Sequence, residues 1–174
     1  MGVRPTGLDL SGPLISAAAR RFPYLPLVRG SYTALPFKND YFDCALISFN
    51  GIDYAPRVED RAAAFEECHR ILKAAGKLIL SSHNIKSLHF SPYYFLEFGT
   101  LRFKLIHTFS AFKSAAYLNS AGRTVRTFHA APEYVVNEAE NAGFRFVEWL
   151  GFRNLRDKRK NRYISPWIHY VFTK

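Results

Sequence analysis

The sequence predicts an α/β domain with a mostly parallel β-sheet. Short apolar runs alternate along the chain with segments of helical spacing, an order that is typical of such domains. One run, Phe42–Phe49 (FDCALISF), contains almost no polar residue, as expected of a strand that is buried on both faces. With 174 residues, 48% of them hydrophobic, the chain is long enough for one domain with a buried core.

The N-terminal half is predicted to begin with a short strand and a helix. Thr6–Asp9 is the end of this strand. The helix covers Pro13–Arg21 and begins at Pro13, because proline suits the first turn of a helix. Leu25–Val28 is a second short apolar run, which stops before Gly30. The long run Phe42–Phe49 then supplies a third strand.

The most regular helical pattern covers Arg57–Ala75. Gly76 follows it as a stop signal, and its apolar residues recur at helical spacing, namely Val58, Phe65, Cys68 and Leu72. After this helix we expect a buried strand at Lys77–Ser82 and a short helix at Pro132–Ala142, which Gly143 closes. The last two strands are expected at Phe144–Leu150 and Trp167–Thr173.

The segment 85–131 interrupts this alternation and is rich in large aromatic and basic side chains. A long insertion at the carboxyl edge of a sheet is often a lid or a substrate cap. A packed helical hairpin without a ligand would explain the same composition, so both interpretations stay open. In either case we expect residues 1–174 to form a single domain, with 85–131 as an insert or cap within it.

Basic residues outnumber acidic ones, which gives a formal net charge of +10 and a pI of about 9.8. An excess of this kind favours an anionic small molecule or a nucleic acid as partner. Several basic residues lie in the run 153–162, which is either a solvated loop or a nucleic-acid patch. The run lacks the interleaved aromatic side chains on which bases stack.

Cysteine usage and the absence of several motifs exclude some classes of protein. Cys44 and Cys68 lie in apolar segments, so we expect buried, reduced thiols and a cytoplasmic location. No run approaches the ~18 apolar residues of a membrane span, and Met1–Asp9 lacks the apolar region of a signal peptide. Neither HExxH nor CxxC is present to indicate a zinc site, and no GxSxG indicates a hydrolase.

Polar residues follow several of the predicted strands, at Asp9, Ser31, 48–53 and 83–84. In open α/β sheets, ligands bind outside the carboxyl ends of the strands. We therefore expect the functional site to be built from these residues.

Four blocks of sequence occur in an order that resembles the class I S-adenosylmethionine-dependent methyltransferases. They are GLDLS (Gly7–Ser11), ALPF (Ala34–Phe37), YFDCALISFN (Tyr41–Asn50) and EECHRILKAAGKLILSSHN (Glu66–Asn84). AGF (Ala142–Phe144), which precedes a predicted strand, also matches. The resemblance covers residues 3–84 and 130–174, and it implies a Rossmann-like methyltransferase fold whose last strand is antiparallel. It also implies S-adenosylmethionine as the cofactor.

The resemblance assigns cofactor-binding roles to residues at the ends of the first two strands. Asp9 would accept hydrogen bonds from the ribose hydroxyls, and Leu10 would pack on the adenine. The alternative for Asp9 is a helix N-cap, although Ser11 could meet that need. Ser31 stands where the family usually has an acid that binds the adenine amino group, and Tyr32 could stack on the base.

At the end of the third strand, the resemblance places Ser48, Phe49 and Asn50 near the methionine part of the cofactor. The family's glycine-rich loop has no counterpart, because the sequence contains no GxG. We therefore expect the family's first strand and first helix to lie upstream of Met1, so that this chain is an N-terminally truncated domain.

These features predict the transfer of a methyl group from S-adenosylmethionine to an unidentified small-molecule acceptor. Because the cofactor is already activated, the protein mainly positions and desolvates the reactants. A neutral nucleophile also needs a base, for which His83, Asp53 and His129 are candidates. Two further hypotheses stay open, namely a catalytically inactive methyltransferase-like binding module and an RNA-binding protein that uses the run 153–162.

Overall fold

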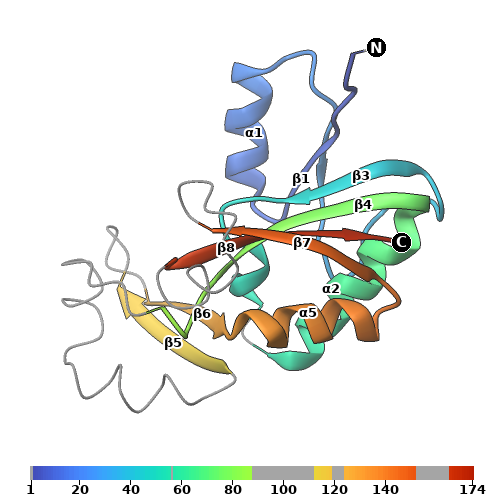
Figure 1. Cartoon of the computed structure of the whole chain (residues 1–174). Coiled ribbons are helices and arrows are strands. Elements are labelled where there is room, and N and C mark those ends of the chain that lie inside the picture. Colours follow the sequence, from blue (N-terminus) through green and yellow to red (C-terminus); the bar gives the residue numbers. More distant parts are fainter. Residues whose placement is uncertain (1, 56, 88–111, 119–123, 152–164) are drawn as a thin grey trace.

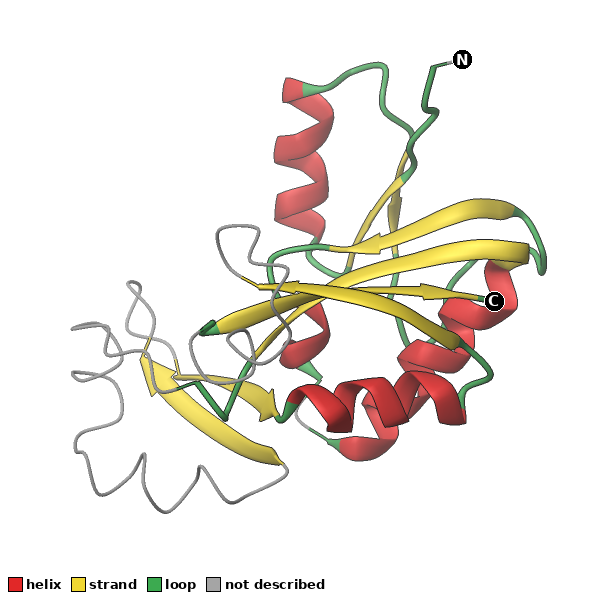
Figure 2. Ribbon diagram, in the orientation of Figure 1, coloured by secondary structure: helices red, strands yellow, loops and turns green. Residues whose placement is uncertain are grey.

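The computed structural model describes residues 2–55, 57–87, 112–118, 124–151 and 165–174. Figures 1 and 2 show the arrangement of the elements. The strands are β1 (Gly7–Asp9), β2 (Leu27–Arg29), β3 (Phe42–Ile47), β4 (Leu72–His83), β5 (Phe112–Leu118), β6 (Thr124–Ala130), β7 (Arg145–Gly151) and β8 (Trp167–Thr173). The helices are α1 (Gly12–Arg21), α2 (Val58–Ile71) and α5 (Pro132–Asn141), with a short 3-10 helix, η1 (Gly51–Tyr54).

The largest sheet has the strand order β3-β4-β8-β7. Strand β3 pairs with β4 in parallel, whereas β8 runs antiparallel to both β4 and β7. Three of the four strands therefore point the same way, and the last strand in sequence is reversed. This arrangement confirms the predicted α/β fold with a mostly parallel sheet and an antiparallel last strand. Strands β1 and β2 form a separate parallel pair.

The buried core lies between this sheet and helices α2 and α5, which occupy one side of it (Figure 2). Its members come from α2, β4, β6, α5 and β8, and among the largest are Phe65, Leu78, Phe128, Tyr170 and Phe172. The predicted strands and helices around this core are confirmed, since α5 and β8 match the expected ranges closely. Gly143 follows α5 with a φ of 93°, a left-handed value that glycine adopts readily.

The expectation that β3 is buried on both faces is wrong. Phe42, Ala45 and Ile47 pack against the core, but Leu46 is 68% exposed and Cys44 is also exposed. The strand pairs with β4 along one edge, and no described strand covers its other edge or its outer face. The prediction of a buried thiol is therefore wrong for Cys44. It is confirmed for Cys68, whose pKa burial raises to about 12.

Helix α2 ends at Ile71, four residues before the predicted end at Ala75. Leu72 is extended and pairs with Phe42, so β4 begins there and Gly76 lies inside the strand instead of capping the helix. The register shifts between Phe42 and Cys44, which accommodates an irregularity before Lys77. A Cβ atom at Gly76 would lie 2.8 Å from the Lys73 carbonyl oxygen, so close backbone packing requires glycine there.

Within the insert 85–131, the described residues 112–118 and 124–130 form two strands. Strands β5 and β6 pair antiparallel, and β6 joins the core through Phe128 and Ala130. Ala130 also bridges to Asn84 at the end of β4. Part of the segment is therefore integral to the domain. Residues 88–111 and 119–123, where a lid or cap would have to be sought, lie outside the described residues.

Glu67 and Arg70, which both lie on α2, bind the backbone of a segment far from them in sequence. Arg70 donates hydrogen bonds to Glu67 and to the carbonyl oxygens of Leu35 and Phe37, at 2.7–2.8 Å. Glu67 in turn accepts from the Leu35 backbone N–H at 2.6 Å. The pair thus fixes the ALPF segment against α2. Hydrogen bonding and the charge of Arg70 hold the pKa of Glu67 below its usual value.

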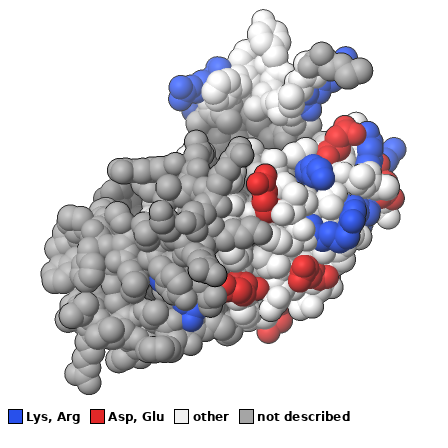
Figure 3. All heavy atoms as spheres, viewed as in Figure 1, with Lys and Arg blue, Asp and Glu red and all other residues white. Residues whose placement is uncertain are grey.

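The charge distribution gives no separate support for a nucleic-acid surface. On the face in Figure 3, described Lys and Arg side chains lie beside Asp and Glu side chains. The basic run 153–162 lies outside the described residues, so that partner stays a prediction. Among the described residues, none of the helices has the length and apolar character needed to cross a membrane.

Candidate active site

The carboxyl ends of β1 and β2 lie side by side, because Asp9 is paired with Arg29 and Gly30 N–H donates to the Asp9 carbonyl oxygen. Asp9 Oδ1 accepts a hydrogen bond of 2.7 Å from Ser11 N–H. Ser11 is the N-cap of α1, with its hydroxyl accepting from Leu14 N–H at 3.4 Å. Asp9 is therefore not the N-cap. Its Oδ2 has no partner among the described residues and can accept from a ligand.

The other residues predicted to bind the cofactor in this region differ in their exposure and in their hydrogen bonds. Leu10 is 68% exposed and offers an apolar surface beside Asp9. Ser31 is occupied locally, because its hydroxyl bonds the Thr33 hydroxyl at 2.7 Å and the Thr33 N–H at 3.2 Å. Tyr32 packs partly against the core, and burial raises the pKa of its phenol.

The chain reverses sharply after β3, at Phe49 and Asn50. Both residues have left-handed backbone conformations, with φ values of 52° and 55°. Such values cost about 1–2 kcal/mol each outside glycine, and strain of this kind occurs where a side chain must be aimed at a site. Asn50 N–H donates to Ser81 Oγ at 2.8 Å, which ties this turn to β4. Phe49 is 91% exposed, and Ser48 is exposed beside it.

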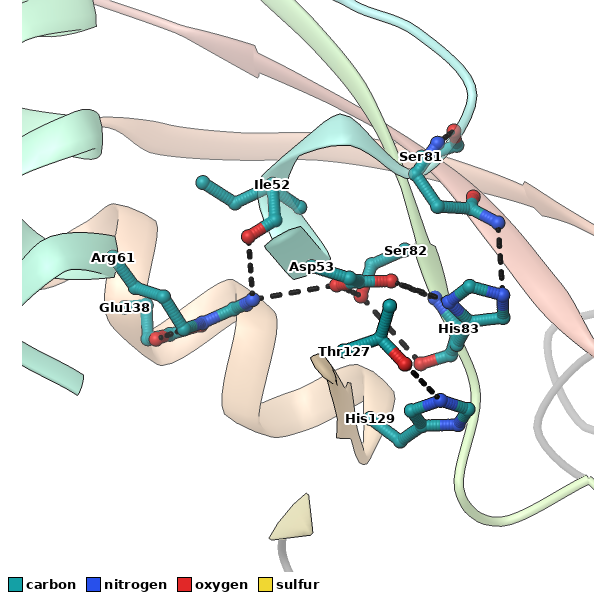
Figure 4. Close-up of polar contacts among 10 residues, drawn as sticks. Ile52, Asp53, Arg61, Ser81, Ser82, His83, Thr127, His129 and Glu138 are labelled. Carbon is teal, nitrogen blue, oxygen red and sulfur yellow. Dashed lines mark hydrogen bonds and ion pairs between the residues drawn. The ribbon is translucent and has the colours of Figure 1, made fainter. Parts of the chain in front are cut away.

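Asp53 and His83 form a hydrogen-bonded pair between η1 and the end of β4 (Figure 4). Asp53 Oδ2 accepts from the His83 backbone N–H at 2.7 Å and contacts His83 Nδ1 at 2.8 Å. Because a carboxylate only accepts, Nδ1 carries the imidazole proton in this arrangement. Nε2 therefore carries the lone pair of the ring, which accepts a hydrogen bond from Asn50 Nδ2 at 3.3 Å.

Arg61 and Glu138 lie on the side of Asp53 that faces away from His83 (Figure 4). Asp53 Oδ1 accepts from Ser82 Oγ at 2.7 Å and from Arg61 Nη1 at 3.3 Å. Arg61 is bidentate to Glu138, at 2.7 and 2.6 Å, and it also donates to the Ile52 carbonyl. Asp53 and Arg61 are both fully buried. A buried carboxylate whose oxygens each accept from two donors is held in one position.

Burial and neighbouring charges act in opposite directions on this network. For Arg61, burial disfavours the charged form, but Glu138 and Asp53 outweigh it and keep the pKa above its usual value. For Glu138, burial is the stronger effect and raises the pKa despite the contact with Arg61. The Arg61 guanidinium also lies 4.2 Å from the centre of the Phe128 ring, which it covers.

His129 lies against His83 from strand β6. The two imidazole rings are stacked, with centroids 4.5 Å apart and an interplanar angle of 14°. His129 Nε2 contacts Thr127 Oγ1 at 3.0 Å (Figure 4). Imidazole lone pairs lie in the ring plane, so parallel stacked rings do not direct them at one metal ion. No group of three or more potential metal ligands was found among the described residues.

The structure thus brings together four residues that the sequence suggested separately, namely Asn50, Asp53, His83 and His129. It keeps Asp9, Leu10, Ser31 and Tyr32 at the ends of β1 and β2. Sequence reasoning missed Arg61, Ser82 and Glu138. A signal for Arg61 existed, because a charged residue stands on the same helical face as Phe65 and Cys68.

Comparison with known proteins relates the N-terminal half of the chain to methyltransferases. Residues 1–80 match a family described as methyltransferase domain. The demethylmenaquinone methyltransferase of Streptomyces avermitilis is 35% identical over 72 residues, which are 41% of this chain and 29% of that protein. The enzyme of the same name from Chlorobaculum tepidum is 26% identical over 150 residues, covering 86% of this chain and 59% of that protein. The chain thus covers less than two thirds of either relative.

A solved structure extends the similarity to the whole fold. The crystal structure of a SAM-dependent methyltransferase from Methanosarcina mazei superposes with a TM-score of 0.70 and 18% identity. The superposition covers 97% of this chain and 81% of that protein. The arrangement of strands and helices is therefore that of a Rossmann-like methyltransferase fold.

Proposed function

We propose that this chain, which has the class I methyltransferase fold, transfers a methyl group from S-adenosylmethionine to a small-molecule acceptor. The observation that carries the proposal is the grouping of polar side chains at the carboxyl ends of two parallel strand pairs. Asp9 stands at the end of β1, and Asn50 and His83 stand at the ends of β3 and β4. These are the places where an open α/β sheet binds its ligands.

The described residues fit the polar and apolar parts of the cofactor. Asp9 would accept the ribose hydroxyls through Oδ2, and exposed Leu10 would cover the adenine. Ser31 is a weaker partner than predicted, because its hydroxyl is already bonded to Thr33. Ser48, Phe49 and Asn50 would face the methionine part. The cofactor supplies an electrophilic methyl group, and the protein supplies position and exclusion of water.

The acceptor is proposed to be a small molecule, in keeping with the two relatives named for demethylmenaquinone methylation. Demethylmenaquinone in its reduced form is therefore the first acceptor to test. The net charge of +10 additionally favours anionic acceptors over cationic ones.

A thermal melt with S-adenosylhomocysteine, followed by a radiolabelled methyl-transfer assay, tests the proposal. A ligand that binds the folded state raises the melting midpoint. We expect Asp9→Asn to weaken cofactor binding roughly 10- to 100-fold, the worth of a charge-assisted hydrogen bond. Asp43→Asn is the matched control, because that carboxylate is exposed and pairs with Lys73. A cooperative melt that ignores the ligand would instead favour the inactive binding module.

A further inference from the structure

We propose that His83 is the catalytic residue that accepts a proton from the methyl acceptor, and that Asp53 positions it. The inference rests on the proposed function and specifies its acceptor as a molecule whose nucleophilic atom carries a proton, such as a hydroxyl. His83 Nε2 is the atom concerned. It carries the lone pair of the ring because Asp53 fixes the proton on Nδ1 at 2.8 Å, and the acceptor hydroxyl would take the place of the Asn50 amide that donates to it at 3.3 Å.

Three observations support a position of Nε2 at the reaction site and not in the protein interior. The His83 side chain is 23% exposed, whereas Asp53 behind it is fully buried. Nε2 lies 3.3 Å from Asn50, the residue assigned to the methionine part of the cofactor. The hydrogen bond from Asn50 N–H to Ser81 Oγ, at 2.8 Å, ties the left-handed turn at Phe49 and Asn50 to β4. An acceptor bound near Asn50 therefore comes within reach of Nε2.

The arrangement also distinguishes a base from other uses of histidine. A nucleophilic triad would need a hydroxyl against Nε2, but among the described residues Nε2 has the Asn50 amide as its neighbour. Stacking on His129 directs the two sets of lone pairs away from a common point, which does not suit a metal. A histidine whose Nδ1 is held by a buried carboxylate is the usual form of a general base.

Proton transfer to His83 accompanies the transfer of the methyl group. The nucleophilic atom of the acceptor, either the hydroxyl oxygen or a ring carbon that the hydroxyl activates, forms a bond to the methyl carbon as the bond from that carbon to the sulfonium sulfur breaks, with its electron pair remaining on sulfur. The hydroxyl proton passes to His83 Nε2, and the resulting imidazolium is stabilised by Asp53. Release of that proton to solvent restores the neutral ring. Among the described residues, the charged and titratable groups around this ring are Asp53 and His129, with Arg61, Glu138 and Tyr170 beyond Asp53.

His83→Asn is the decisive variant, because the asparagine amide can still donate to Asp53 but has no basic nitrogen. We expect methyl transfer to fall 10²- to 10⁴-fold, the usual contribution of a general base. The melting shift with S-adenosylhomocysteine should be unchanged. The loss should shrink as acceptors of increasing hydroxyl acidity are used, since these ionise without help. His69→Asn is the control, since His69 packs against Phe144 near the far end of α2.

A second readout does not depend on turnover. Nitrogen-15 chemical shifts should show the Nδ1-protonated form of His83 in the wild-type chain and a mixture of both tautomers in Asp53→Asn. A His83 protonated on Nε2, or a His83→Asn variant with at least a third of wild-type activity, would overturn this inference alone. A wild-type chain that neither shifts with S-adenosylhomocysteine nor methylates any acceptor would overturn the proposed function and this inference with it.

Discussion

The unit β1–α1–β2 and the four-stranded sheet use similar apolar sequences but bury them to different extents. Helix α1 has no buried residue, and Leu14, Phe22 and Tyr24 around it are exposed. By contrast, α2 buries Phe65 and Cys68 along with a charged residue. None of the core residues precedes β3, although Tyr32 packs against the core from outside.

The two halves of the candidate site are therefore held in place by different kinds of interaction. The Asp53–His83 pair is held by a buried network before any ligand binds. Asp9 is held by local hydrogen bonds, from Ser11 N–H to its side chain and from Gly30 N–H to its carbonyl oxygen. We infer that the acceptor side is preorganised, whereas the cofactor side gains much of its stability from the cofactor.

The largest effect is expected from Arg61→Leu, which would leave Asp53 and Glu138 as buried charges without their cation. Breaking a buried ion pair by removing one partner costs about 3–5 kcal/mol. We expect a loss of this size in the free energy of unfolding, measured by urea denaturation. Arg57→Leu is the control, because its exposed pair with Asp60 contributes far less. Equal losses in the two variants would contradict the idea of a preformed acceptor side.

Hydrogen exchange should separate the two regions directly. Amides of α1 and β2 should exchange through local opening, at free energies below that of global unfolding, whereas amides of β4 and β8 should approach the global value. S-adenosylhomocysteine at a hundred times its Kd should raise the opening free energy of α1 by about 2.7 kcal/mol. Equal protection of α1 and β4 without ligand would refute the contrast.

The next largest effect on the free energy of unfolding is expected from the Glu67–Arg70 pair, because it ties the segment between the two regions to α2. Arg70→Leu removes hydrogen bonds to Glu67, Leu35 and Phe37, and we expect a loss of about 2 kcal/mol in unfolding free energy. Lys73→Leu, which breaks an exposed contact to Asp43, is the control. A loss no larger than that of the control would show that the segment is held by packing alone.

The same pair predicts a pH dependence. Arg70 lowers the pKa of Glu67 from its ordinary value of 4.5, so the folded state binds this proton less readily than the unfolded state. The stabilisation is present above pH 4.5 and is lost as the pH falls through the lower folded-state pKa. Urea titrations between pH 6 and about 3 should therefore show a shallower acid loss in Arg70→Leu than in the wild type. Parallel curves would contradict the assignment to Glu67.

The sequence predicted most of the framework because apolar periodicity reports local structure. The carboxyl-end rule also selected Asn50, Asp53 and His83 before their contacts were known. It could not show that β3 has an uncovered face, because an apolar run does not reveal what packs against it.

The partners of Asp53 were harder to predict, because they come from distant parts of the chain. Arg61 and Glu138 are separated by 77 positions and meet only after α2 and α5 pack together. His129 reaches His83 only because β6 joins the end of β4. Contacts of this kind depend on tertiary packing, which neither spacing nor propensity encodes.

The smallest effect is expected within the preformed region itself, at Tyr170. Its hydroxyl is buried on β8 and has no hydrogen-bond partner among the described residues, and burial raises the pKa of the phenol well above its usual value. An unsatisfied buried hydroxyl carries a desolvation cost, so Tyr170→Phe should leave the unfolding free energy unchanged or raise it by up to about 1 kcal/mol. Tyr54→Phe, at a half-exposed position, is the control. A clear loss of stability in Tyr170→Phe would mean that the hydroxyl is bonded in solution and belongs to the network around Asp53.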